Sequence, residues 1–229
     1  MPETTQFPLR KAALISGLAL LASVAAAPFA EMYVFPKLVV SYDAATTAKN
    51  IAENESLFIW GIFAYFITFL VDIVLAWSLY ILLKPVGKYL SLFAGILKLT
   101  YSIIALVALN NLVTALRLIT TPDYLKVFGQ DQINSLAMLY IRAFKNHWYF
   151  GLIIFGLHLL LVGALIYKSK YIPKIFGILI CITGLGYLLT SIRPYFFPDV
   201  NVDFAMYTFY GEIIFMFWLL IRGHRIENR

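Results

Sequence analysis

The chain has 229 residues, of which 62% are hydrophobic and only 13% are charged. Soluble domains carry roughly 25% charged residues, so this composition excludes an ordinary soluble domain and indicates a polytopic membrane protein. The net charge of +6 does not indicate nucleic-acid binding, because the basic residues stand in short groups beside apolar segments and form no stripe. We interpret them as orientation signals and lipid-headgroup contacts. No linker or repeat divides the chain, so we expect one transmembrane domain, residues 1–229.

The first apolar segment spans about residues 13–35 and allows two interpretations. The preceding basic residues and the run from Ala25 to Ala27 match a cleaved signal peptide, whereas the segment is longer than the roughly 7 to 15 apolar residues of such a peptide. Its length favours a retained helix. The next segment, residues 41–56, is polar, but four apolar residues recur at helical spacing and Asp43 suits an N-cap. This pattern predicts a short amphipathic helix.

Five further apolar segments follow, so we expect six membrane-spanning helices in an all-α bundle. The expected helices cover about residues 13–35, 57–83, 89–119, 148–167, 172–192 and 204–221. The loop over residues 120–135 leads through an amphipathic segment, residues 136–145, into the fourth helix. Glycines spaced seven residues apart on the fourth and fifth helices allow close backbone approach and predict a tight hairpin between them. These glycines are Gly156, Gly163, Gly177 and Gly184.

The basic residues predict the orientation. One side of the membrane would carry many basic residues and only Glu3 and Glu227 as acids, whereas the basic residues of the other side are diluted among acids in longer loops. The basic-rich side would hold Arg10, Lys11, Lys84, Lys88, Lys168, Lys170, Lys174, Arg222, Arg225 and Arg229; the other side would hold Lys37, Lys49, Lys126, Arg142, Lys145 and Arg193. By the positive-inside rule, both termini are expected in the cytoplasm.

Four ionisable residues on four different helices are expected at one depth. Asp72 lies roughly 18 Å along a helix from Lys84, and Lys98 lies roughly 15 Å from Lys88, at about 1.5 Å per residue. His158 precedes Lys168 by ten residues, and Glu212 precedes Arg222 by ten, which also gives roughly 15 Å. Each residue would cost about 2.5 to 3.5 kcal/mol if it faced lipid, so we expect them to face inward. The set Asp72, Lys98, His158 and Glu212 is called the polar layer below.

Two interpretations of the polar layer stay open. In the functional one, it lines a cavity for protons or a polar solute, because intramembrane acids and histidines are the groups that form proton relays. In the structural one, Asp72 and Lys98 form an ion pair that fixes helix register. Glu212 and His158 are then satisfied by each other or by hydroxyls such as those of Thr100, Ser102 and Tyr187. Interpretation of the polar layer as a transport site and interpretation as an enzyme site both assume that the sixth helix lies against the fourth.

A second group is expected at the outer face: Glu31, Asn110, Asn111, Arg117 and Arg193. Counted from the basic side, Glu31 and Arg193 lie about 30 Å away, at the opposite interface. This group could form a mouth that selects a solute or headgroup, or it could consist of solvated helix ends. We call Glu31, Asn110, Asn111 and Arg193 the candidate mouth.

Signatures of enzymes are absent from the sequence: it contains no HExxH, no paired CxxC, no GxSxG and no glycine-rich phosphate loop. A metal held by His158, Asp72 and Glu212 is stoichiometrically feasible, but no pair of them has the helical spacing that preorganises a metal site. The sequence therefore predicts no metal and no cofactor, and it favours a protein that is not an enzyme.

Several blocks resemble a known family. They are residues 155–161, 166–177 and 184–188, the turn at residues 83–86, the helix of Asp72, and the final blocks at 211–212 and 218–220. Together they resemble the bacterial membrane family called domain-of-unknown-function family 4386, over about residues 10–223. The resemblance implies a multi-helix protein of a bacterial cytoplasmic membrane. It implies no activity.

We therefore expect a multi-pass inner-membrane protein that contacts the lipid bilayer and handles a small polar solute or a lipid. The favoured function is small-solute or proton-linked transport or sensing through the polar layer. The alternatives are a membrane-embedded enzyme acting on a lipid or headgroup, with His158 as general base, and a structural or regulatory membrane protein. The solute, the direction of transport and the oligomeric state do not follow from the sequence.

Overall fold

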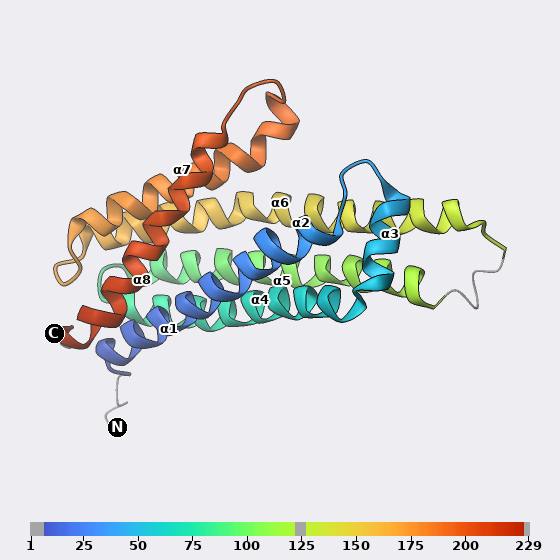
Figure 1. The fold of residues 1–229 in the computed structure, drawn as a ribbon. Coiled ribbons are helices and arrows are strands. Elements are labelled where there is room, and N and C mark those ends of the chain that lie inside the picture. The colour runs from blue at the N-terminus through green and yellow to red at the C-terminus, as the bar shows by residue number, and fades with distance from the viewer. Residues whose placement is uncertain (1–6, 122–126, 227–229) are drawn as a thin grey trace. The chain divides into compact units, whose positions relative to one another are not determined.

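The computed structural model describes residues 7–121 and 127–226, and the regular structure of these residues is helical (Figure 1). Six segments of the described chain are long and apolar enough to cross a membrane. They are Leu9–Leu38, Glu55–Leu83, Lys88–Thr120, Gln130–Lys168, Lys174–Phe196 and Asp203–Arg225. The predicted all-helical fold with six candidate spans is thus confirmed. Of the residues used to predict orientation, Glu3, Lys126, Glu227 and Arg229 lie outside the described residues.

The first span is interrupted near its end. α1 (Leu9–Pro28) continues as a π-helical stretch, η1 (Phe29–Val34), and then as α2 (Phe35–Leu38). Pro28 has no amide hydrogen, and its ring crowds the preceding turn, so the regular hydrogen-bond ladder cannot pass through it unchanged. The chain adopts the wider π register instead, in which the amide of Phe35 donates to the carbonyl of Ala30.

The predicted amphipathic helix is present as α3 (Ala44–Glu53), and Asp43 is its N-cap. The Asp43 carboxylate accepts from the amide of Thr46 at 2.9 Å and from its hydroxyl at 2.6 Å. The four apolar residues at helical spacing are Ala44, Ala48, Ile51 and Ala52; of these Ala48 and Ile51 are buried, Ala44 is half-buried and Ala52 is exposed. The asparagine Asn50 also donates to the carbonyl of Leu38, which ties α3 to the end of α2.

The next two spans, α4 (Glu55–Leu83) and α5 (Lys88–Thr120), agree with the predicted bounds to within two residues. The fourth span does not. The predicted start near residue 148 is wrong, because α6 (Gln130–Lys168) is one continuous helix. Gly129 precedes it and no proline interrupts it, and the amphipathic residues keep the helical period, with Ile133, Ala137 and Ile141 buried. The amphipathic segment therefore extends the span and is not a separate element.

The last two spans are shorter. α7 (Lys174–Phe196) matches the fifth predicted helix, with a later start and a later end. The sixth predicted helix is composite: a 3₁₀ stretch, η3 (Asp203–Phe209), leads into α8 (Tyr210–Arg222), which ends in η4 (Gly223–Arg225). Glu212 therefore lies in the first turn of α8 and not in the middle of a long helix.

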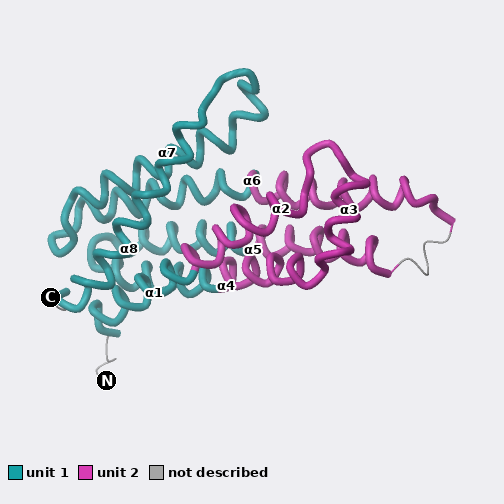
Figure 2. Tube along the Cα trace, viewed as in Figure 1, with its two compact units in different colours: residues 1–22, 71–102, 150–229 teal, residues 23–70, 103–149 magenta. Residues whose placement is uncertain are grey.

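The described chain forms two compact units (Figure 2). Unit 1 comprises residues 1–22, 71–102 and 150–229, and unit 2 comprises residues 23–70 and 103–149. No linker separates them along the sequence, because α1, α4, α5 and α6 each contribute residues to both. The single transmembrane domain therefore stays a prediction.

In unit 1 the six helices form a closed ring. Each helix approaches the next, and the last approaches the first, in the order α1, α4, α5, α6, α7, α8. The pairs that mark these approaches are Ser16 with Ser78, Asp72 with Lys98, Ala94 with His158, Gly163 with Gly177, Leu179 with Gly211, and Leu219 with Gly17. The helices of such a ring share an interior, and residues of all six line one cavity there.

The predicted hairpin between the fourth and fifth helices is confirmed as the α6–α7 pair. A β-carbon added to Gly163 would lie 2.7 Å from the Gly177 carbonyl oxygen, and one added to Gly184 would lie 2.9 Å from the Gly156 carbonyl oxygen. Only glycine fits at such distances, since the neighbouring atoms belong to the backbone and cannot move aside.

Unit 2 is organised around aromatic rings. Tyr65 is fully buried, and its ring centroid lies 5.0 Å from that of Phe144 and 5.3 Å from that of Trp148. Phe35 joins this cluster through Tyr65 at 5.5 Å. Tilted and edge-to-face rings at these separations attract one another beyond the effect of the area that they bury.

Candidate functional site

The centre of the candidate site is a buried ion pair across the α4–α5 hairpin of unit 1. The Lys98 ammonium lies 2.8 Å from the Asp72 carboxylate, and the two side chains are only 2% and 6% exposed. The same ammonium lies 4.1 Å from the centre of the Phe155 ring and 5.3 Å from that of Tyr101. The Lys98 charge is therefore held by one carboxylate and by the faces of two aromatic rings.

His158 joins the pair from α6. Its Nδ1 lies 2.8 Å from the carbonyl oxygen of Ala94 on α5. A carbonyl oxygen can only accept, so Nδ1 carries a hydrogen and donates it. The imidazole is thereby held in one orientation, stacked on Phe155 at 5.9 Å, with Nε2 as the nitrogen that remains for proton exchange.

Glu212 approaches from the first turn of α8. It is half-buried, forms a side-chain hydrogen bond with Tyr187 of α7, and lies close enough to Lys98 and Asp72 to interact with both charges. Tyr187 is one of the three hydroxyl partners expected from the sequence. Ser102 donates instead to the carbonyl of Lys98, and Thr100 is exposed on the outside of α5.

A cavity joins three of the four residues of the polar layer. It has an empty volume of about 280 Å³, is lined by Lys98, His158 and Glu212 among apolar side chains such as Leu75 and Phe215, and has room for roughly one water molecule. From the sequence we assumed that the sixth helix lies against the fourth. In the ring of unit 1, α7 stands between α6 and α8, and both α6 and α8 line the same cavity.

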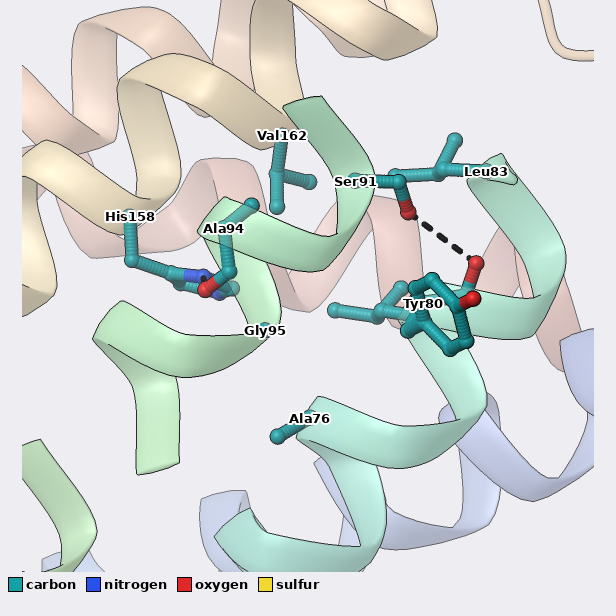
Figure 3. Close-up of a pocket in the computed structure, with 9 residues that line it drawn as sticks. Ala76, Tyr80, Leu83, Ser91, Ala94, Gly95, His158 and Val162 are labelled. Atoms are coloured by element: carbon teal, nitrogen blue, oxygen red, sulfur yellow. Dashed lines mark hydrogen bonds between the residues drawn. The ribbon is translucent and has the colours of Figure 1, made fainter. Parts of the chain in front are cut away.

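His158 also borders a second, narrow space, which is too small to hold a water molecule and is shown in Figure 3. This cavity lies between α4, α5 and α6, and its lining is almost entirely apolar, with Ala76, Leu83 and Val162 among the residues. The Ser91 hydroxyl is not available in it, because it donates to the carbonyl of Tyr80 at 3.0 Å. His158 is therefore the polar group that the two cavities share.

The four residues of the polar layer thus lie together inside unit 1, whereas their functional role stays a prediction. Sequence reasoning missed Tyr101 and Phe155, whose rings face Lys98. A signal was present, since Tyr101 follows Lys98 by three residues and Phe155 precedes His158 by three, which places each pair on one helix face.

The candidate mouth has a different arrangement in each unit. In unit 2 the Glu31 carboxylate accepts from the Tyr65 hydroxyl and lies 3.4 Å from the Lys145 ammonium. Asn111 lies 3.4 Å from the His147 ring, and Asn110 is exposed. In unit 1 the side chain of Arg193 donates to the carbonyl of Val200 and closes the loop after α7. Lys145 and Tyr65, which sequence reasoning did not connect with Glu31, are its partners.

Metal binding has no geometric support in the part of the chain that the structure describes. There, no three or more His, Cys, Asp or Glu side chains gather in a way that could hold an ion. The candidate site is instead a cluster of charges, rings and hydroxyls around a small cavity.

The fold and the buried cluster define the class: the protein is an integral membrane protein with a multi-pass helical bundle and an ionisable interior. The chain belongs to the family described as "Domain of unknown function (DUF4386)", whose sequence model matches residues 15–223. The resemblance noted in the sequence is thereby confirmed.

One relative is an uncharacterised protein from the archaeon Archaeoglobus fulgidus. It is 33% identical over 170 residues, which cover 74% of this chain and 88% of the relative. No solved structure matches the chain. Neither the family nor this relative has an assigned activity.

Proposed function

We propose that the protein carries out proton-linked transport of a small polar solute, or senses protons, through the polar layer of unit 1. The observation that carries the proposal is the cavity that Lys98, His158 and Glu212 line together. The His158 ring and the Glu212 carboxyl both border this water-sized space, and water-mediated hydrogen bonds are suitable for proton transfer between groups that do not touch.

The charges around Lys98 supply a way to couple a proton to a solute. Lys98 interacts with two carboxyl groups, Asp72 directly and Glu212 at longer range. When Glu212 binds a proton, one of the two negative charges disappears and the electrostatic balance at Lys98 changes. A polar solute that enters the cavity would respond to the same balance, so its affinity and the protonation of Glu212 would be linked.

The second candidate is an enzyme that acts on a lipid, and the apolar cavity beside His158 favours it. The space is too narrow for a water molecule as it stands, so an acyl chain would enter only if α4, α5 and α6 moved apart, and the His158 imidazole would then act as general base on a headgroup. This candidate requires an opening of the cavity toward lipid. It predicts product formation with lipid as the only substrate, and it predicts no solute flux.

The experiment is a flux assay in liposomes that contain the purified protein and a pH-sensitive dye. A potassium gradient with valinomycin drives proton entry, first alone and then with a panel of small polar solutes outside. The proposal expects faster acidification than in empty liposomes, and loss of the difference in Glu212→Gln and His158→Gln. Glu53→Gln, which removes an exposed carboxylate paired with Lys49 on α3, is the matched control and keeps the flux.

A second measurement tests the proposal that the protein senses protons. Infrared carboxyl absorbance, assigned by its absence in Glu212→Gln, is followed against bulk pH in lipid. A Glu212 band that responds to pH, with a response that changes in His158→Gln, supports a coupled site that water reaches. A band that never responds, together with no flux, rejects the proposal and leaves the structural interpretation.

For location we propose the cytoplasmic membrane of a bacterium, with both termini inside. Support comes from the basic residues that surround the ends of the spans in unit 1, as the positive-inside rule requires.

A further inference from the structure

Two tight turns of unit 1 are joined at one end of the helix ring. One turn connects α4 to α5, and the other connects α6 to α7. The Tyr171 hydroxyl of the second turn donates to the carbonyl of Leu82, just before the first turn, at 2.5 Å. A β-carbon on Gly87 would lie 3.3 Å from the Leu165 side chain. The two turns are therefore fixed against each other by a hydrogen bond and by apolar packing.

This joint is stable to changes in pH. Burial raises the pKa of Tyr171 to about 12, so the hydroxyl keeps its proton and remains a donor throughout the physiological range. The turn itself is braced by Ser169, whose side chain is buried and accepts from the amide of Ile172 at 3.2 Å.

The two turns carry a concentrated positive charge. They and the adjoining helix ends present five exposed lysines: Lys84, Lys88, Lys168, Lys170 and Lys174. The neighbouring chain, residues 73–102 and 150–198, contains no Asp or Glu. Nothing in these stretches neutralises the lysines. Two exposed tyrosines accompany them: the Lys88 ammonium lies 5.9 Å from the Tyr89 ring, and the Lys174 ammonium lies 5.3 Å from the Tyr167 ring.

We propose that these joined turns bind the headgroup of an anionic phospholipid. The turns stand at the ends of four candidate membrane spans, where headgroup phosphates lie, and tyrosines beside lysines are typical of that level of a bilayer. Lysine ammonium groups attract phosphate as point charges. Because the Tyr171 bond fixes one turn on the other, the backbone that carries the lysines of both turns is already held in place before a headgroup binds. This inference does not depend on the proposed transport function.

The test measures the preference of the purified protein for spin-labelled phosphatidylglycerol over spin-labelled phosphatidylcholine in mixed bilayers at low salt. The wild type is expected to favour phosphatidylglycerol, by about fivefold for each lysine that engages. The double variant Lys170→Gln with Lys174→Gln is expected to lose most of the preference. The matched control, Lys37→Gln with Lys49→Gln, removes the same charge from unit 2 and is expected to keep it.

The variant Tyr171→Phe distinguishes a binding site that depends on the joined turns from general attraction between lysines and anionic lipid. It leaves every lysine in place but removes the bond to Leu82, so a several-fold weaker preference supports the site. Each variant is first shown to keep its helical circular dichroism. The proposal is overturned if the wild type has no preference, if the preference survives in both the double variant and Tyr171→Phe, or if soluble glycerol phosphate at equal concentration competes as well as the lipid.

Discussion

The surroundings of Lys98 explain how its charge can be buried and why that burial costs free energy. Its ammonium has lost almost all contact with solvent, and the 2.8 Å contact with Asp72 and the two ring faces replace hydration only in part. A buried pair of this kind adds less stability than an apolar pair of similar size would.

At this scale we predict that Lys98→Met costs about 3 to 5 kcal/mol of unfolding free energy, because it leaves the buried Asp72 carboxylate without its cation. The double variant Asp72→Leu with Lys98→Met is expected to recover most of that loss. Denaturant unfolding in detergent micelles, followed by circular dichroism, measures both values. A double variant as unstable as Lys98→Met alone would show that the interior requires the charges themselves for folding.

At the scale of elements, the close packing of the α6–α7 hairpin lets us predict the effect of enlarging one of its glycines. The change Gly163→Ala would place a β-carbon 2.9 Å from the Cys181 amide nitrogen as well as against the Gly177 carbonyl, so the two helices must separate. We expect a loss of about 1 to 3 kcal/mol, the usual cost of overpacking, measured as a lower thermal midpoint in micelles.

The matched control is Gly95→Ala on α5. There the nearest atom, the carbonyl oxygen of Ala76, is 3.6 Å from the added carbon, which is an ordinary contact. Alanine favours helix by up to about 1 kcal/mol over glycine, so this variant should be as stable as the wild type or slightly more so. Equal losses at both positions would contradict a hairpin set by close backbone approach.

We predict that the stability of α3 depends on pH. Hydrogen bonds from the hydroxyl and then the amide of Thr46 lower the pKa of Asp43 from its usual value of 3.8. A carboxyl whose folded pKa is lowered stabilises the helix above its unfolded pKa, and the stabilisation is lost as pH falls through the folded pKa. Protection of α3 amides against hydrogen exchange should therefore fall below about pH 4. Asp43→Asn, a neutral cap, should show no such fall.

At the scale of the whole molecule, the six spans and the positive-inside rule predict which loops are accessible from outside the cell. The residue Thr46 follows the first span and Lys170 follows the fourth, so they should lie on opposite sides of the membrane. In a Cys181→Ser background, an impermeant maleimide should label Thr46→Cys in intact cells. It should label Lys170→Cys only after the membrane is opened, and the reverse pattern would place the termini outside.

Helix count and the depth of the charged residues were predictable because they depend on local sequence. Apolar segments long enough to cross a bilayer identify spans without knowledge of their neighbours, and residues counted from basic helix ends give depth. The start of α6 was not predictable, because an amphipathic extension and a separate surface helix have the same period. The composite sixth span was missed for a related reason, since a 3₁₀ stretch and an α-helix have similar apolar patterns.

The sequence by itself therefore determined the class of protein and the six candidate spans, because insertion into lipid depends on composition and length. It also predicted that Asp72, Lys98, His158 and Glu212 share one level. Only the tertiary structure decided which of these groups meet. Helix rotation and neighbour choice depend on packing between segments far apart in the chain. That packing pairs Asp72 with Lys98, bonds His158 to Ala94, joins Glu212 to Tyr187, and leaves a cavity where His158 and Glu212 face the same water-sized space.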